Sequence, residues 1–210
     1  MRIAVVGANG RTGRSVVRQA RERSIEVTAV ARRHGTTPPE PGLSRVAGDV
    51  LDRERITDAL AGVDAVVSAV GIGTSRQPTE LYSAGTANLL NAMAANGVKR
   101  VVVISALPVG AGPEHSFADR RIVFPILERI FGATYRDMRR MEALLRDSAA
   151  DWTSLRPPRL VAAPVTGRYR LDATRPLPGA RSISYADLAT AVLDVVDRDD
   201  LHRRAAYVAN

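Results

Sequence analysis

The 210 residues of this chain suit one α/β domain of ordinary globular composition, with 45% hydrophobic and 25% charged residues. The absence of cysteine excludes disulfides, a thiolate nucleophile and a thiolate metal site, and the three histidines are too dispersed to predict a metal centre. No apolar run is long enough to span a membrane, and the chain starts on a strand pattern rather than a signal peptide. We therefore expect a cytoplasmic protein without a membrane partner.

The net charge of +8 does not by itself predict a nucleic-acid partner. The arginines are scattered along the chain, whereas a nucleic-acid footprint gathers on one face. A positive field would equally steer an anionic cofactor to the protein. We expect no nucleic acid, and a monomer or weak homodimer.

The first thirteen residues combine a strand pattern, a glycine-rich turn and the start of a helix. Residues 1–6 are a short run of β-formers, and Gly7–Gly13 follows at once with the sequence GANGRTG. Gly7 permits the sharp turn, Gly10 lets backbone approach a diphosphate, and Gly13 lets the helix lie close to the strand. The N–H groups and the dipole at the start of that helix would face the phosphates. This context predicts a dinucleotide site.

Two arginines, Arg32 and Arg33, follow the second strand pattern at residues 25–31. In dinucleotide folds this point faces the adenosine ribose, where an acidic residue suits NAD and an arginine suits the 2′-phosphate of NADP. Because a guanidinium matches a phosphate well, the sequence favours NADP(H) over NAD(H). A solvated basic turn is the alternative.

Strand and helix patterns alternate along the rest of the chain. We expect strands at 44–47, 64–70, 99–105, 151–156 and 205–208, and helices at 53–60, 78–96, 117–149 (with a break near 132–134) and 185–196. Residues 159–182 hold three prolines and two glycines, and we expect them to cap the carboxyl edge of the sheet. The alternation predicts one Rossmann-like α/β domain over residues 1–210, a doubly wound parallel sheet with helices on both faces and a small C-terminal cap.

Segments along nearly the whole chain resemble landmarks of the atypical short-chain dehydrogenase/reductases. Gly7–Gly13 resembles the GATGxTG start of that group, and the further matches are Arg32, 48–50, 68–71, 103–106 and 151–158. The likeness is closest to the NAD(P)H-binding, NmrA-like branch that includes biliverdin-IXβ/flavin reductase. The resemblance implies a Rossmann fold and a nicotinamide dinucleotide site.

For the adenosine half of the cofactor, the resemblance implies three sets of contacts. The residues around the diphosphate would be those of the glycine loop: Gly7, Asn9, Gly10, Arg11, Thr12 and Gly13. Arg32 would meet the 2′-phosphate, with help from Arg33. Asp49 and Val50 would flank the adenine, with Asp49 accepting from its amine, although Asp49 also suits a turn.

For the nicotinamide half, the resemblance implies contacts at the ends of three strands. The residues that would line the ribose follow the fourth strand: Ala69, Val70 and Gly71. Ser105 would end the fifth strand beside the nicotinamide. Pro157 would pack near that ring.

The tyrosine–lysine pair of catalytic short-chain dehydrogenases is not matched. In that pair, lysine lowers the pKa of the tyrosine so that it acts as an acid or base. Counting back from Glu142, the two positions fall on Thr134 and Met138. Tyr135 has Arg139 at the same spacing and is a candidate, with helix-surface residues as the alternative. An alcohol–ketone reaction is therefore not favoured.

A reductase does not need that pair when its acceptor is conjugated. A flavin-, quinone- or bilin-like acceptor spreads the charge itself, and the protein mainly orients two rings. Ser105 is a candidate to orient or donate, unless backbone satisfies it. His115 is a candidate proton donor, unless it is a solvated loop histidine. We predict an NADPH-dependent reductase of such a small molecule, with a non-catalytic NADP(H) sensor that binds a partner protein as the alternative.

Overall fold

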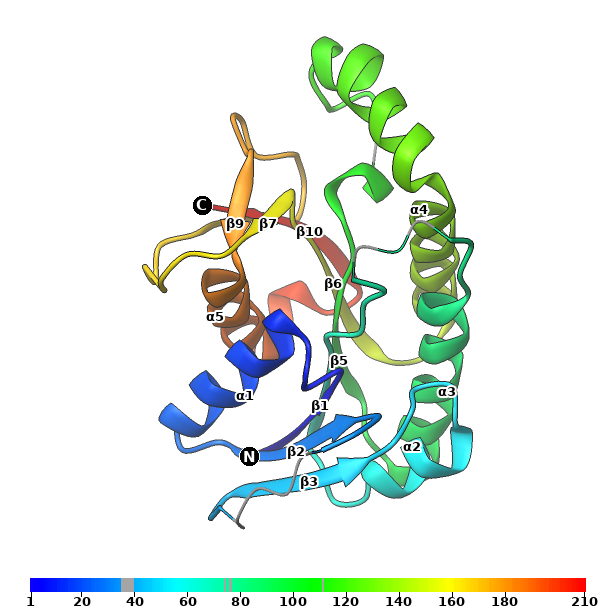
Figure 1. Ribbon diagram of the computed structural model, residues 1–210, viewed down its shortest axis with the longest axis vertical. Coiled ribbons are helices and arrows are strands. Elements are labelled where there is room, and N and C mark those ends of the chain that lie inside the picture. Colours follow the sequence, from blue (N-terminus) through cyan, green and yellow to red (C-terminus); the bar gives the residue numbers. More distant parts are fainter. Residues whose placement is uncertain (35–39, 74, 76, 111) are drawn as a thin grey trace.

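The structure is a computed structural model that describes every residue except 35–39, 74, 76 and 111. Figure 1 shows a central sheet between two layers of helices. The strands of this sheet are β1 (Arg2–Val6), β2 (Glu26–Ala31), β3 (Leu43–Ala47), β4 (Ala65–Ser68), β5 (Arg100–Ile104), β6 (Asp151–Arg156), β8 (Arg170–Asp172) and β10 (Arg204–Ala209).

The order of the strands is β3-β2-β1-β4-β5-β6-β10-β8. All neighbours run parallel except β8, which is antiparallel to β10. Since β1 pairs with β2 on one side and β4 on the other, the direction of winding reverses there. This confirms the predicted doubly wound Rossmann-like fold, whose ligand crevice lies at the carboxyl ends of the strands at this reversal.

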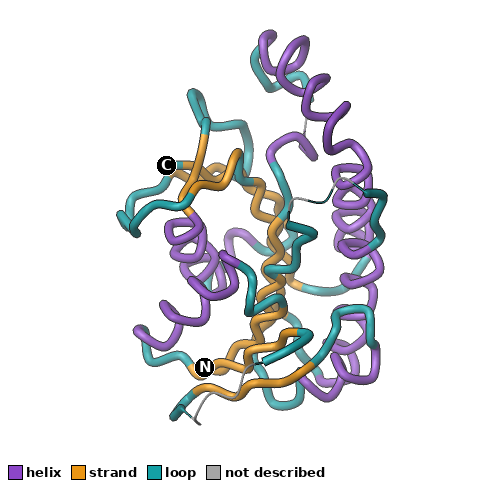
Figure 2. The backbone as a smooth tube through the Cα atoms, in the orientation of Figure 1, coloured by secondary structure: helices purple, strands orange, loops and turns teal. Residues whose placement is uncertain are grey.

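Helices cover both faces of the sheet (Figures 1 and 2). On one face lie α1 (Arg11–Glu22) and α5 (Tyr185–Val196), and on the other α2 (Arg53–Ala59), α3 (Leu81–Asn96) and α4 (Phe124–Asp147). Two apolar cores result, one with Val5 and Leu188, the other with Val66 and Met141. The central strands β1, β4 and β5 are apolar except at one end because each has a core on both sides. In the described part of the chain, every helix is too short or too polar to cross a bilayer.

Two predicted boundaries differ around β4. The strand ends at Ser68 rather than at residue 70, so the next residues belong to a loop. The helix expected from residue 78 begins at Leu81. Asp137 of α4 explains this start, because its buried carboxylate accepts the N–H of Tyr82 at 2.8 Å and so caps α3 from outside.

The predicted break at residues 132–134 is wrong, because α4 runs without interruption from Phe124 to Asp147. Gly132 costs a helix about 1 kcal/mol relative to alanine, which is not enough to end it. The packing of α4 against α3 overrides this local preference. Three short elements complete the fold: η1 (Leu107–Gly110), η2 (Asp119–Val123, a π-helix leading into α4) and η3 (Asp199–Leu201).

Residues 159–182 contain strands that the sequence did not predict. β7 (Arg159–Val161) pairs in parallel with β9 (Ser182–Ser184), and β8 joins the main sheet. Asp187 of α5 anchors this segment, because its buried carboxylate accepts the N–H groups of Thr166 and Gly167 at 2.8 and 2.9 Å. Strands of three residues are too short to show a periodic pattern in the sequence. They form because they pair with strands that are distant in the chain.

We expect Asp187→Ala to loosen this segment and to lower the free energy of unfolding by about 1–3 kcal/mol, because it removes the acceptor of several part-buried hydrogen bonds. Hydrogen exchange at Thr166 and Gly167 should accelerate. The matched control is Asp200→Ala, which removes an exposed ion pair with Arg198 and should cost less than about 1 kcal/mol. Unchanged exchange at the two amides in Asp187→Ala would show that the carboxylate is not the anchor.

Candidate dinucleotide site

The glycine loop after β1 lies directly against the loop after β4. Gly7 has φ +85°, and a Cβ there would stand 2.7 Å from the carbonyl oxygen of Ala69. A Cβ on Gly13 would stand 2.2 Å from the carbonyl oxygen of Gly7. The N–H of Ala69 donates to Val6 at 2.8 Å and prolongs the pairing of β1 with β4. Only glycine fits at positions 7 and 13, because backbone fills the space of a side chain.

The N-terminus of α1 opens onto this loop. Gly10 is the N-cap in an extended conformation, no side chain caps the helix, and the first turn has no acidic residue. The free N–H groups at the start of α1 can therefore donate hydrogen bonds to an anion, whose binding the helix dipole also favours. Arg11 is exposed beside it, and Thr12 is buried within the first turn. The Gly7–Gly13 loop and the N-terminus of α1 together form what we call the glycine cradle. The shape of this cradle and its positive N–H groups suit a dinucleotide diphosphate.

Arg32 and Arg33 lie at the end of β2 beside the glycine loop, and both are exposed. The side-chain amide of Asn9 donates to the carbonyl of Arg33 at 2.5 Å, and the N–H of Gly7 donates to Val30 of β2 at 2.9 Å. The structure thus brings the predicted diphosphate and 2′-phosphate residues to one edge of the sheet.

Asp49 and Val50 follow β3 at the same edge. One carboxylate oxygen of Asp49 accepts the N–H of Leu51 at 3.0 Å, so the residue does stabilise a turn. Its side chain remains half-exposed. Val50 is buried against Gly85 of α3, where a Cβ would stand 2.9 Å from the valine side chain. Val50 therefore offers an adenine little surface, and Asp49 is the more accessible of the two.

Ala69, Val70 and Gly71 form the loop after β4, whose backbone lies against the glycine loop at Gly7. Tyr82 supports this loop from α3, since its hydroxyl accepts the N–H of Ile72 at 3.4 Å. Burial raises the pKa of Tyr82, so the phenol stays neutral and acts as a support. The sequence does not reveal this hydrogen bond of Tyr82, because the contact depends on tertiary packing.

Ser105 and Pro157 lie side by side after β5 and β6. The N–H of Ser105 donates to Leu155 at 2.8 Å, and Leu107 donates to the carbonyl of Pro157 at 2.8 Å. The hydroxyl of Ser105 is buried and makes no well-aligned hydrogen bond within the described residues, although it lies near enough to Glu142 to help lower the pKa of that carboxyl. A buried hydroxyl without a good partner is uncommon and suits contact with a ligand.

The α4 residues at the tyrosine and lysine positions do not reproduce an activated tyrosine. Thr134 and Met138 are both buried. The neighbouring Tyr135 packs edge-on against Phe131, with ring centres 6.2 Å apart, and burial raises its pKa. Arg139 pairs with Glu128. A tyrosine that acts as a base needs a lowered pKa, so this environment opposes that role.

His115 is buried, unlike the solvated loop histidine of the alternative interpretation. Its Nε2 lies 3.1 Å from the carbonyl oxygen of Gly110 and 3.3 Å from the hydroxyl of Tyr207. Its ring packs edge-on against Phe124, with ring centres 4.9 Å apart. These contacts connect the loop after β5 to β10 and to the start of α4.

The contact between Arg11 and Tyr185 could not be predicted from the sequence. The guanidinium of Arg11 stands 5.5 Å from the ring centre of Tyr185, and its Nη1 donates to the tyrosine hydroxyl at 3.4 Å. The two residues begin α1 and α5, which are adjacent on one face of the sheet. No local pattern links residues so far apart in the chain.

We expect Gly10→Ala to weaken binding of NADP⁺ by about tenfold, because the added methyl crowds the N-cap where backbone must approach a diphosphate. The new Cβ would stand 3.2 Å from the carbonyl oxygen of Gly7, a contact that a small shift relieves, so thermal unfolding should change little. Calorimetric titration measures the affinity. Gly97→Ala is a control for affinity alone: no atom stands within 4 Å of its Cβ, but its φ of +70° means that alanine there lowers stability. Equal binding by Gly10→Ala and the unchanged protein would contradict the diphosphate assignment.

Comparison with known proteins shows which family the sequence matches. The sequence profile of the NAD(P)H-binding family matches residues 7–199. A protein of Burkholderia pseudomallei is 30% identical, superposes with a TM-score of 0.81, and is covered over 100% of both chains. A candidate NADH-flavin reductase of Streptococcus pneumoniae, 22% identical, superposes with a TM-score of 0.77 over 100% of this chain and 99% of that one.

The chain also matches part of longer relatives. An uncharacterized protein of Mycobacterium tuberculosis is 28% identical over 209 residues, which are 97% of this chain and 19% of that protein. The chain therefore spans about a fifth of the length of this relative. The family match confirms the nucleotide-binding family that the sequence motifs indicate.

Proposed function

Because this chain belongs to the NAD(P)H-binding family, we propose that it is an NADPH-dependent oxidoreductase that reduces a conjugated acceptor of the flavin, quinone or bilin type. The observation that carries the proposal is the glycine cradle at the start of α1, with Arg32 and Arg33 beside it at the end of β2. The cradle supports binding of the diphosphate, and the arginines support selection of the 2′-phosphate. The bound nicotinamide supplies the hydride.

The chain's own residues bind and orient the two rings. In the proposed complex, Ala69, Val70 and Gly71 contact the ribose of the nicotinamide half, and Pro157 packs near the nicotinamide ring. The buried Ser105 hydroxyl is available to the nicotinamide carboxamide or to a carbonyl of the acceptor. Residues 159–182 would cover the acceptor as a small cap.

The absence of an activated tyrosine on α4 supports a conjugated acceptor. With Thr134 and Met138 at the tyrosine and lysine positions, no activated phenol is present there to protonate an alkoxide. A conjugated acceptor delocalises the charge that it receives, and a bound water can protonate it. Tyr135 and His115 remain secondary candidates for proton transfer, since burial raises the pKa of Tyr135 and His115 is already engaged with Gly110 and Tyr207.

A non-catalytic NADP(H) sensor is the second candidate, since the lack of a lysine at Met138 is as compatible with a sensor as with the reductase. Oxidation of NADPH with FMN, FAD and small quinones separates the two functions. Turnover with any of these acceptors supports the reductase, whereas NADP⁺ binding without turnover supports the sensor. Absence of NADP⁺ binding would contradict both.

We expect Ser105→Ala to lower kcat by about tenfold or more while leaving the Kd for NADPH within about twofold, because the hydroxyl acts on the reacting rings rather than on the phosphates. Steady-state kinetics and calorimetry measure the two quantities. Ser44→Ala, on the exposed side of β3, is the matched control and should change neither. An unchanged kcat in Ser105→Ala would show that the hydroxyl takes no part in the reaction.

A further inference from the structure

A helical arm, residues 117–131, projects from the body of the protein and is apolar on its exposed side. It consists of η2 with the residues before it and the first turns of α4, and Figure 1 shows it extending past the sheet. Between residues 116 and 130 only Phe124 is buried. The large apolar side chains left exposed are Phe117 (76%), Ile122 (58%), Val123 (42%), Ile126 (55%) and Ile130 (36%). Such a contiguous patch marks an interaction surface.

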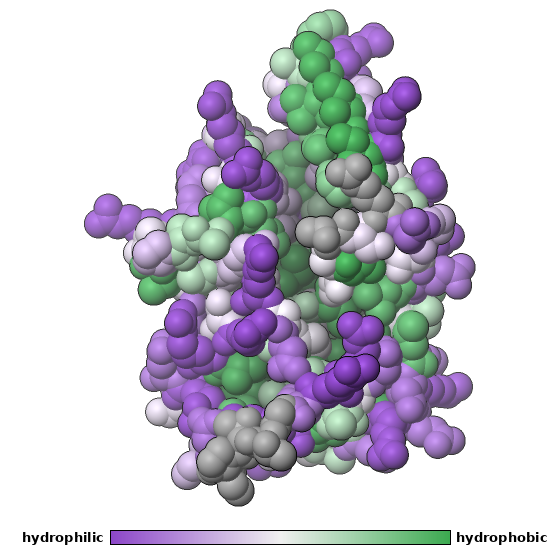
Figure 3. Space-filling model, viewed as in Figure 1, coloured by the Kyte–Doolittle hydropathy of each residue, from purple (hydrophilic) through white to green (hydrophobic). Residues whose placement is uncertain are grey.

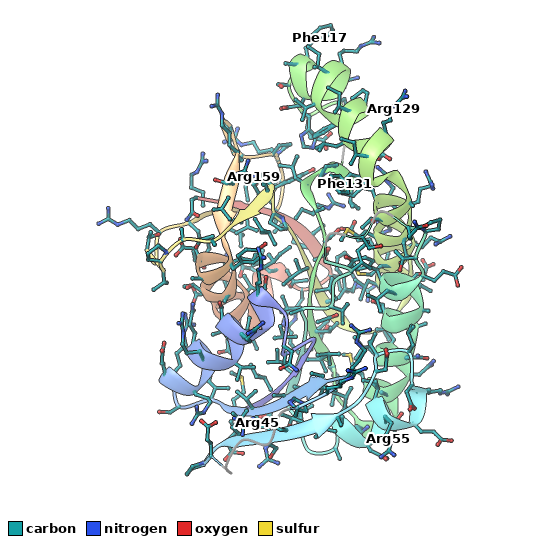
Figure 4. The ribbon with its side chains drawn as sticks, viewed as in Figure 1. Arg45, Arg55, Phe117, Arg129, Phe131 and Arg159 are labelled. Carbon is teal, nitrogen blue, oxygen red and sulfur yellow. The ribbon has the colours of Figure 1, made fainter. Side chains whose placement is uncertain are left out.

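These side chains form a ridge flanked by positive charge. Ile122, Ile126 and Ile130 recur every four residues and so follow one side of the helix. Figure 3 shows hydrophobic residues gathered along the arm, and Figure 4 places Phe117 at its outer end. Arg121 lies over the ring of Phe117 at 5.9 Å, and Arg129 is also exposed on the arm.

A second basic surface lies across from the arm. Residues 159–182 contain one acidic residue and five arginines, all exposed: Arg159, Arg168, Arg170, Arg175 and Arg181. Figure 4 shows Arg159 and Phe131 on opposite sides of the space between this segment and the arm. One end of the molecule therefore combines an apolar ridge with a concentration of arginines.

We propose that this end of the protein docks on an anionic lipid surface. The isoleucine ridge and Phe117 would enter the boundary between headgroups and acyl chains, while the surrounding arginines contact lipid phosphates. A basic amphipathic helix with aliphatic and aromatic residues on its apolar face has the composition that such docking needs. The expectation of no membrane partner rests on the lack of a spanning segment, and docking on a lipid surface needs no such segment.

Charge disfavours a second copy of the chain as the occupant. A two-fold interface would place the same patch against itself, arginines facing arginines. On the arm only Asp119 and Glu128 could compensate, and Glu128 already pairs with Arg139. An anionic lipid surface instead offers counter-charge to the arginines beside the ridge.

Flotation of the 210-residue chain with lipid vesicles tests the proposal without any measurement of turnover. We expect binding to vesicles of equal parts phosphatidylcholine and phosphatidylglycerol, little binding to phosphatidylcholine alone, and loss of binding at high salt, where surface charges are screened. Ile126→Glu should weaken binding at least about tenfold, because it places a carboxylate at the lipid boundary. Leu144→Glu is the matched control on the same helix, where the leucine is 37% exposed outside the arm, and it should bind as the unchanged chain does.

Three outcomes would overturn the proposal. One is absence of binding to the anionic vesicles, and another is equal weakening by Leu144→Glu. The third is a dimer in solution, measured by light scattering, that Ile126→Glu dissociates, since the ridge would then be an interface between copies. Circular dichroism of both variants shows whether each remains folded. Because NADP⁺ binding is measured separately, failure here leaves the proposed reductase untouched.

Discussion

Arg32→Glu is expected to raise the Kd for NADPH by about 100-fold and the Kd for NADH by less than about threefold. The substitution removes charge-assisted hydrogen bonds to the 2′-phosphate and adds repulsion, a loss of about 3 kcal/mol. NADH has no phosphate at that position, and a glutamate can accept from its free 2′-hydroxyl. Calorimetry or fluorescence titration with each nucleotide measures the ratio.

The control for Arg32→Glu must change the net charge equally at a distant place. Arg146→Glu, exposed in the last turn of α4, meets this need and should weaken both nucleotides only slightly. Arg33→Glu should fall between the two variants, because Arg33 is exposed beside Arg32 but is tied to Asn9 only through its carbonyl. Equal losses of NADPH and NADH affinity in Arg32→Glu would defeat the 2′-phosphate assignment.

Glu142→Gln is expected to lower the free energy of unfolding by about 3–5 kcal/mol, because it leaves the guanidinium of Arg156 buried without its counter-ion. Glu142 is 2% exposed, and its carboxylate accepts from Arg156 at 2.5 and 3.1 Å and from Ser154 at 2.8 Å. The ion pair between Glu142 and Arg156 joins α4 to β6 next to Ser105. Urea unfolding at neutral pH measures the loss.

The same pair predicts how stability depends on pH. Burial alone would raise the pKa of Glu142, but the hydrogen bonds and charge of Arg156 outweigh burial and hold this pKa below its ordinary value. A carboxyl with a lowered pKa in the folded state stabilises the fold above its unfolded pKa of about 4.3, and this contribution is lost as pH falls through the folded value. The difference between the unchanged chain and Glu142→Gln should therefore be constant above about pH 5 and shrink in acid.

Two further variants separate the ion pair from general effects. Glu26→Gln removes an exposed pair with Arg2 and should cost less than about 1 kcal/mol. In Glu142→Gln with Arg156→Met, most of the lost stability should return, because no buried charge is left without a partner. A double variant as unstable as Glu142→Gln alone would indicate that packing, and not the uncompensated charge, causes the loss.

The fold and the glycine cradle were predictable because their causes are local. Gly7 and Gly13 sit where backbone occupies the space of a side chain, so the sequence pattern carries the geometry directly. The Ser184 cap of α5 is equally local, since its hydroxyl accepts the N–H of Asp187 at 2.8 Å. The break predicted at Gly132 failed for the opposite reason, because packing on α3 stabilises α4 beyond what its own residues prefer.

The amino-acid sequence alone determined the family, the alternation of strands and helices, and the positions of the glycines and arginines that we propose bind phosphate, since each depends on neighbouring residues. Tertiary structure alone decided which distant side chains meet. It set His115 against Tyr207, Arg11 against Tyr185 and Arg156 against Glu142, and it left the Ser105 hydroxyl buried without a well-aligned partner among the described residues. These contacts depend on how the loops and helices pack around the sheet, and packing couples residues that no local pattern connects.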